Sequence, residues 1–212
     1  MSLTFILAGF LIATFLMTVA KRVTALIGAF RLQSIFLFLY TLAMAVTQKH
    51  LELFLVSGLI LALKVIVIPY VLTRIVRRIE VEENLGLVVN PPISLVIALS
   101  LACLAYVFAH QIMPRALPAE LDAFVVSIAA IGIGFFIMVS RLKALSQVLG
   151  LLAMESGILL AAAAITGGMP FFVEIALAFD LFLFVIIVEI FVYRVNRLFT
   201  HIDTSKMNSL KG

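Results

Sequence analysis

Residues 151–165, LLAMESGILLAAAAI, contain one ionisable side chain, Glu155, in a run that is otherwise small or apolar apart from Ser156. Apolar residues continue on both sides of this stretch. A helix rises about 1.5 Å per residue, so the whole run is long enough to cross a hydrocarbon layer of about 30 Å. A carboxylic acid at the centre of such a helix is costly and needs an explanation. Whether the stretch is a membrane helix depends on the rest of the chain.

The composition of the chain is that of a membrane protein. Of its 212 residues, 65% are hydrophobic and 12% are charged, whereas soluble domains have about 45–50% and about 25%. Too few polar side chains remain to cover a soluble globule. The net charge is +4, but the basic residues lie between apolar runs, where they indicate membrane topology rather than nucleic-acid binding.

Seven segments are long and apolar enough to span a bilayer as helices. They cover residues 3–20, 24–47, 51–76, 91–110, 120–140, 142–166 and 170–197. The first segment has no preceding positive charge and no small-residue cleavage site, so we expect a retained helix rather than a signal peptide. The sequence therefore predicts an all-α, polytopic membrane helix bundle with about seven transmembrane helices.

Lysine and arginine are distributed unequally between the two ends of these helices. Lys49 and Arg115 lie at one end, Arg31 and Lys64 lie inside helices, and eleven lie at the other end. Because cytoplasmic loops carry the excess of Lys and Arg, the N-terminus is predicted outside and the C-terminus in the cytoplasm. The eleven are Lys21, Arg22, Arg74, Arg77, Arg78, Arg141, Lys143, Arg194, Arg197, Lys206 and Lys211.

The chain also contains a weak internal repeat. KRVTAL starts at residue 21, and the similar SRLKAL starts 119 residues later, each after an apolar span. The repeat divides the chain into an N-terminal three-helix unit (1–79), a linker with the fourth transmembrane helix (80–119), and a C-terminal three-helix unit with a polar tail (120–212). The alternative is that apolar helices resemble one another by composition alone.

Three ionisable residues lie near the middle of predicted helices: Lys64, Glu155 and Asp180. Burial disfavours the charged form of each, and a nearby opposite charge favours it, so a change in their separation would change their affinity for protons. We therefore predict a proton or ion relay at mid-membrane depth. The structural alternatives are a static salt bridge of Lys64 with Glu155 or Asp180, and a helix that docks on a partner protein.

Polar support for this relay is expected from neighbouring positions. Because packed helices lie about 8–10 Å apart, water or small polar groups should bridge the charged residues. Ser156, Gln33 and Ser34 are the candidate polar groups. Pro69 lacks an N–H, so a kink is expected there, and it should open a wet pocket beside Lys64.

No metal or cofactor site is predicted in this chain. The single cysteine, Cys103, cannot form an intrachain disulfide or an iron–sulfur site, and we expect it to be a small buried core residue. The three histidines lie at segment ends without the spacing of metal ligands. The chain is therefore predicted to be non-catalytic.

Five motifs carry a resemblance to a known family. They are Gln33-Ser34, LKVIVIP at 63–69, LAMESG at 152–157, VEIALAFD at 173–180 and the terminal NSLKG. Over essentially the whole chain they resemble component E of hydrogenase-4-type, membrane-bound nickel–iron hydrogenases, in which the last charged position is an aspartate, as Asp180 is. The last three helices also resemble subunit K of respiratory complex I. Glu155 matches the first of its two mid-helix glutamates, whereas Asp180 departs from the second.

This resemblance implies a non-catalytic subunit of a complex-I-like, energy-converting hydrogenase or formate-linked complex in the prokaryotic cytoplasmic (inner) membrane. The implied partners are lipids, antiporter-like subunits, a membrane anchor similar to the H component of complex I, and a peripheral arm that holds the nickel–iron centre and iron–sulfur clusters. Lys64, Glu155 and Asp180 would then be part of a proton or sodium pathway coupled to redox chemistry in other subunits.

Three other functions fit the same residues. One is a C-like component of a multisubunit cation/proton antiporter that has no redox arm. Another is a small self-contained transporter built on the internal repeat. The third is a structural assembly subunit, for which neutral residues at the three charged positions would leave coupling intact.

Overall fold

The computed structural model describes residues 3–48, 51–78, 89–114 and 117–166. These residues form helices and no strand. One long helix, residues 51–78, has a π-helical centre. The elements are α1 (Leu3–Val19), α2 (Val23–Gln48), α3 (Leu51–Ile60), η1 (Leu61–Val67), α4 (Ile68–Arg78), α5 (Pro91–Ile112), α6 (Pro118–Ser140) and α7 (Ala144–Thr166).

The six helices predicted between residues 3 and 166 are all present, with ends within two residues of the predicted ends. The seventh, residues 170–197, lies outside the described residues. Within the described part of the chain, five helices are long and apolar enough to cross a membrane, and α1 is a shorter apolar helix. The all-α class and the membrane character are therefore confirmed. The total of seven spans, the orientation and the division into three units stay predictions.

Prolines mark the start of two helices. Pro91 begins α5 after the extended residue Asn90, and Pro118 begins α6 after the extended residue Leu117. Proline is well tolerated in the first turn, where its missing N–H would have no partner within the helix. The backbone N–H of Leu117 donates to the carboxylate of Glu120 at 3.4 Å, which closes the first turn of α6.

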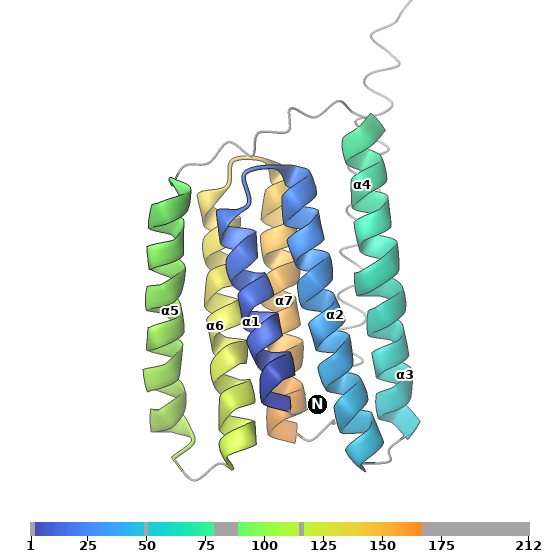
Figure 1. The fold of residues 1–212 in the computed structure, drawn as a ribbon, viewed down its shortest axis with the longest axis vertical. Coiled ribbons are helices and arrows are strands. Elements are labelled where there is room, and N and C mark those ends of the chain that lie inside the picture. The colour runs from blue at the N-terminus through green and yellow to red at the C-terminus, as the bar shows by residue number, and fades with distance from the viewer. Residues whose placement is uncertain (1–2, 49–50, 79–88, 115–116, 167–212) are drawn as a thin grey trace, which may run out of the picture.

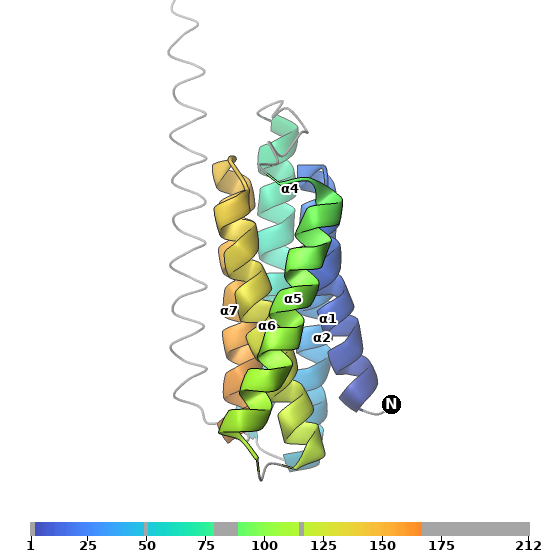
Figure 2. The same cartoon turned by 90° about the vertical axis from the view of Figure 1, so that its left-hand side faces the viewer.

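The helices lie side by side along one axis, with α5 at one edge and the α3–α4 helix at the other (Figure 1). Between these edges, α1 packs on α2 and α6, and α7 packs on α2 and α6. The α1–α2 and α6–α7 hairpins run in the same direction, so their connections lie at the same end, as the view turned by 90° also shows (Figure 2). The end of α4 lies at that end too.

Basic residues collect at this end of the bundle, which the sequence predicts to face the cytoplasm. They come from the α1–α2 connection, from the last turns of α4 and from the α6–α7 connection, segments that are far apart in the sequence. They are Lys21, Arg22, Arg74, Arg77, Arg141 and Lys143.

Three glycines allow α6 and α7 to pack backbone against backbone. A Cβ atom on Gly134 would lie 2.5 Å from the backbone nitrogen of Met154, and one on Gly150 would lie 2.6 Å from that of Met138. A Cβ on Gly157 would lie 2.9 Å from the backbone nitrogen of Ile131. Small residues serve this purpose in membrane helices, because van der Waals contact rather than a hydrophobic driving force holds the helices together.

Small side chains also hold α5 against the bundle. Its buried residues are Ser94, Ala98, Ala105 and Ala109, which recur along one face of the helix.

Many of the large apolar side chains of α5 are exposed, and so is Cys103. The expectation of a buried core position for Cys103 is therefore wrong. A membrane helix is apolar on its outer face as well, so an apolar run around a cysteine does not distinguish core from lipid.

Candidate functional site

Lys64 lies in the middle of the π-helical segment η1, and its surface is 0% exposed. In a π-helix each N–H donates to the carbonyl five residues earlier, and the N–H of Ile68 donates to the carbonyl of Leu63 in this way. Pro69 follows and donates no backbone hydrogen bond, because it has no N–H. The wide helical turn and the proline therefore both occur within a few residues of Lys64.

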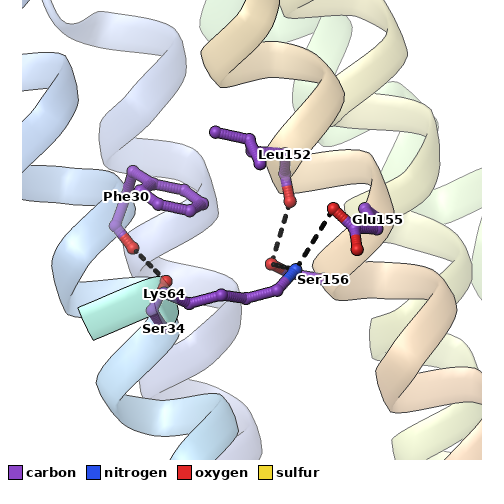
Figure 3. Close-up of polar contacts among 6 residues, drawn as sticks. All are labelled: Phe30, Ser34, Lys64, Leu152, Glu155 and Ser156. Carbon is purple, nitrogen blue, oxygen red and sulfur yellow. Dashed lines mark hydrogen bonds and ion pairs between the residues drawn. The ribbon is translucent and has the colours of Figure 1, made fainter. Parts of the chain in front are cut away.

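The Lys64 side chain crosses from η1 to α7, as Figure 3 shows. Its Nζ lies 3.4 Å from Oε2 of Glu155 and donates to the hydroxyl of Ser156 at 3.4 Å. That hydroxyl donates to the carbonyl of Leu152 at 2.9 Å. Lys64, Glu155 and Ser156 therefore form one cluster, which we call the ion-pair site.

The ion-pair site is buried near the middle of the bundle. Glu155 is 3% exposed and lies at the centre of α7, while Lys64 lies near the centre of the helix that runs from Leu51 to Arg78. A charge at the middle of a membrane helix costs about 2.5–3.5 kcal/mol on insertion scales. A buried charge is tolerated when an opposite charge and hydrogen-bonding groups lie close to it, and α7 provides both for Lys64.

The direct contact differs from the expectation that water or small polar groups would have to bridge Lys64 and Glu155. The flexible four-carbon stem of lysine spans the space between η1 and α7, and the ammonium ends beside the carboxylate (Figure 3). At 3.4 Å the two atoms are farther apart than in a charge-assisted hydrogen bond of about 2.7–2.9 Å. The contact is therefore an ion pair rather than a short charge-assisted hydrogen bond.

Gln33 and Ser34, the other predicted polar groups, lie on α2 and are fully buried. Nε2 of Gln33 donates to the hydroxyl of Thr14 on α1 at 2.9 Å, and that hydroxyl donates to the carbonyl of Phe10 at 2.8 Å. Ser34 donates to the carbonyl of Phe30 at 3.0 Å. Thr14 was not a predicted site residue, although a threonine inside an apolar run is the kind of signal that would identify one.

Pro69 lines a cleft rather than the ion-pair site. The cleft has a volume of about 670 Å³ and lies between α2 and the helix formed by η1 and α4. Val65 is one of its lining residues, whereas the buried Lys64 is absent from the lining that the described residues form. The sequence predicted a wet pocket beside Lys64. The cleft lies at Pro69 but does not include Lys64, whose side chain extends toward α7 (Figure 3).

Asp180, the third predicted relay residue, lies outside the described residues, so the site consists here of Lys64, Glu155 and their polar neighbours. Within the described ranges, no group of three or more histidine, cysteine, aspartate or glutamate side chains is arranged to hold a metal ion. What the arrangement offers chemically is a buried acid and a buried base in contact, which can share or exchange a proton.

Arg141 has a structural role that the sequence did not reveal. It was predicted only as a cytoplasmic charge, but it is 2% exposed and donates to three carbonyl groups at the end of α1: those of Met17 at 3.3 Å, Thr18 at 2.8 Å and Ala20 at 3.0 Å. Burial lowers the pKa of Arg141 to about 10, so the guanidinium stays charged at neutral pH. A cation at the C-terminus of a helix donates hydrogen bonds to the last carbonyls of that helix. It is also attracted by the negative end of the helix dipole.

Comparison with known proteins finds a relative of similar length. The chain is 26% identical over 208 residues to the uncharacterized protein Rv0085 of Mycobacterium tuberculosis, and the match covers 98% of this chain and 94% of the relative. No family model matches the chain, and no solved structure matches it. The similarity therefore includes both helices that form the ion-pair site. Because the relative is uncharacterized, the match does not indicate a function.

Proposed function

We propose that this protein is a non-catalytic membrane subunit of a complex-I-like, energy-converting nickel–iron hydrogenase. In this role Lys64, Glu155 and Asp180 contribute to a proton or sodium pathway that is coupled to redox chemistry in other subunits. Antiporter-like subunits, a membrane anchor and a peripheral hydrogenase arm are its partners, and the prokaryotic inner membrane is its location.

The contact between Lys64 and Glu155 is the observation that supports this proposal most. Both groups are buried at mid-helix, where a charge needs an opposite charge close to it. The distance between ammonium and carboxylate is 3.4 Å, and Ser156 supplies a hydroxyl beside the ammonium. A neighbouring protein that shifts η1 against α7 would therefore break or remake this contact, and coupling requires a site that a neighbour can open and close in this way.

The same contact favours a second role, in which the pair is static and only fixes η1 against α7. Lysine and glutamate side chains in direct contact need no water between them, and such pairs can specify how helices pack. In this role the protein is an assembly subunit, and charge at the site has no part in ion movement.

Glu155→Gln tests the proposal. In the intact complex, reconstituted into vesicles, we expect this variant to reduce ion pumping at least about tenfold, as loss of a required proton-carrying group does. Hydrogenase turnover with a soluble electron acceptor should persist, because the redox chemistry lies in other subunits. Asp122→Asn, which neutralises an exposed acid near the start of α6, is the matched control and should pump normally. Unchanged pumping by Glu155→Gln would rule out the relay.

The double variant Lys64→Met with Glu155→Leu separates the two roles. Apolar side chains of similar size can replace a buried ion pair with little loss of stability. If the pair is static, assembly and pumping both return in the double variant. If the pair is a relay, the complex assembles but does not pump. Proteins that co-purify with the chain distinguish the hydrogenase complex from an antiporter, which has no redox arm.

A further inference from the structure

The cleft between α2 and the η1–α4 helix is built from two facing helical stripes. On α2 the lining residues are spaced three to four apart from Thr24 to Arg31, and on the other helix they are spaced similarly from Val65 to Arg77. Residues at this spacing lie on one face of a helix. The cleft of about 670 Å³ is therefore a continuous groove along both helices rather than a gap at a single level.

Three arginines line this groove: Arg31 from α2, and Arg74 and Arg77 from α4. All three are exposed, and no aspartate or glutamate is part of the lining that the described residues form. The guanidinium group presents several N–H donors in one plane, which matches the oxygens of a phosphate. Arg74 and Arg77 lie in the last turns of α4, at the basic end of the bundle, so the groove has a positive end of the kind that binds phosphate groups.

Hydroxyl groups lie among the arginines. Nη1 of Arg74 donates to the hydroxyl of Tyr70 at 3.3 Å, which orients both side chains at the rim of the groove. Thr73 and Thr24 also line it. Tyrosine is enriched at the interface between membrane and water, where its ring is in contact with lipid and its hydroxyl with polar groups. These residues place the polar part of the groove at headgroup level.

The opposite end of the groove is apolar along the η1–α4 helix. Ile66 and Pro69 line it there, and Ile66 is 55% exposed although it lies near the middle of a membrane helix. Arg77 lies at the end of α4 where the bundle collects its basic residues. The groove therefore runs from charged donors at one end of the bundle to an apolar surface toward its middle, as the phosphate and acyl chains of a phospholipid do.

We infer that this groove is a binding site for an anionic phospholipid, with the phosphate held by Arg74 and Arg77 and an acyl chain along Ile66. The site is separate from the ion-pair site, because Lys64, Glu155 and Ser156 do not line it. A bound lipid would contact the outer side of η1, whose inner side carries Lys64. The inference does not require the proposed function, since it concerns a different face of the same helix.

Phosphatidylglycerol binding to the purified full-length chain tests the inference. Each basic residue near an anionic lipid surface contributes about fivefold in affinity, so Arg74→Gln with Arg77→Gln should weaken binding about 25-fold. Arg74→Lys with Arg77→Lys should lose less, because charge is kept while the planar donors are lost. The control is Lys21→Gln with Lys143→Gln, which removes two charges at the same end outside the groove. Binding is measured by native mass spectrometry, with helical content checked for each variant.

Three results would overturn the inference. One is an equal loss of binding in the control variant, which would indicate general surface charge. Another is equal affinity for phosphatidylcholine or for free glycerol phosphate, since the groove is expected to need both net negative charge and an acyl chain. The third is an unchanged affinity of the Arg74→Gln, Arg77→Gln variant for phosphatidylglycerol, which would show that these arginines do not hold the phosphate.

Discussion

At the scale of single residues, the position of Lys64 in a π-helical turn has a direct consequence for pairing. A π-turn inserts one residue relative to an α-helix, so the faces before and after it are rotated against each other. Lys64 lies inside this turn, with its side chain toward Glu155, while its neighbour Val65 lines the groove on another face. Adjacent positions of one short segment therefore serve an internal contact and the lining of the groove.

Arg141 provides a test of stability at the scale of a single residue. Arg141→Ala would leave three carbonyls at the end of α1 without their donor, and each lost partner of a buried group costs about 1–3 kcal/mol. We expect a loss of about 3 kcal/mol in the free energy of unfolding, which lowers the melting temperature by about 6–12 °C. Thermal unfolding in detergent, followed by circular dichroism, measures it.

The lysine variant and an exposed neighbour are the controls for Arg141. Arg141→Lys should recover part of the loss, because an ammonium keeps the charge but cannot reach three carbonyls as a planar guanidinium does. Lys21→Ala, which removes an exposed charge at the same end of the bundle, should change the melting temperature little. If Arg141→Ala matched Lys21→Ala, the cap on α1 would have no energetic importance.

At the scale of helices, the sequence predicted the elements well but not their contacts. Apolar runs of membrane-spanning length and prolines at helix starts determine the helix boundaries, because these signals act within the segment itself. The Lys64–Glu155 pair was one of two pairings that the sequence allowed. Its direct geometry depends on how η1 packs against α7, which no local pattern encodes. The cap formed by Arg141 depends on the end of α1, more than a hundred residues earlier in the chain.

Gly150 gives a test of helix packing between α6 and α7. In Gly150→Ala the new Cβ would lie 2.6 Å from the backbone nitrogen of Met138 and 2.9 Å from the carbonyl oxygen of Gly134. Backbone atoms cannot rotate away as a side chain can, so the helices would have to separate. We expect a loss of about 1–3 kcal/mol in the free energy of unfolding, as overpacked cores show. Chemical denaturation in detergent measures it.

The matched control is Gly58→Ala in α3, where a Cβ would meet no atom within 4 Å. Alanine is the better helix former by about 1 kcal/mol, so this variant should be as stable as the natural chain or more stable. Gly150→Ala and Gly58→Ala make the same chemical change in two helices. Equal stabilities of the two variants would show that α6 and α7 do not need the close approach.

At the scale of the whole molecule, the ion-pair site joins two parts of the chain that the internal repeat separates. Lys64 belongs to the first predicted three-helix unit and Glu155 to the second, and the α1–α2 hairpin packs on the α6–α7 hairpin in the same direction. A movement of one unit against the other would therefore act directly on the ion pair. Both hairpins share the basic end of the bundle, which is predicted to face the cytoplasm.

Orientation in the membrane is tested by labelling single cysteines in a Cys103→Ala background, a change on the outer face of α5. We expect a membrane-impermeant maleimide to label Leu117→Cys in intact cells, because Leu117 is 66% exposed and lies at the end opposite the basic residues. Lys143→Cys and Asn90→Cys lie at the basic end and should react only after the cells are permeabilised. The reverse pattern would invert the predicted orientation. Labelling of both Leu117→Cys and Lys143→Cys in intact cells would show that α6, which connects them, does not cross the membrane.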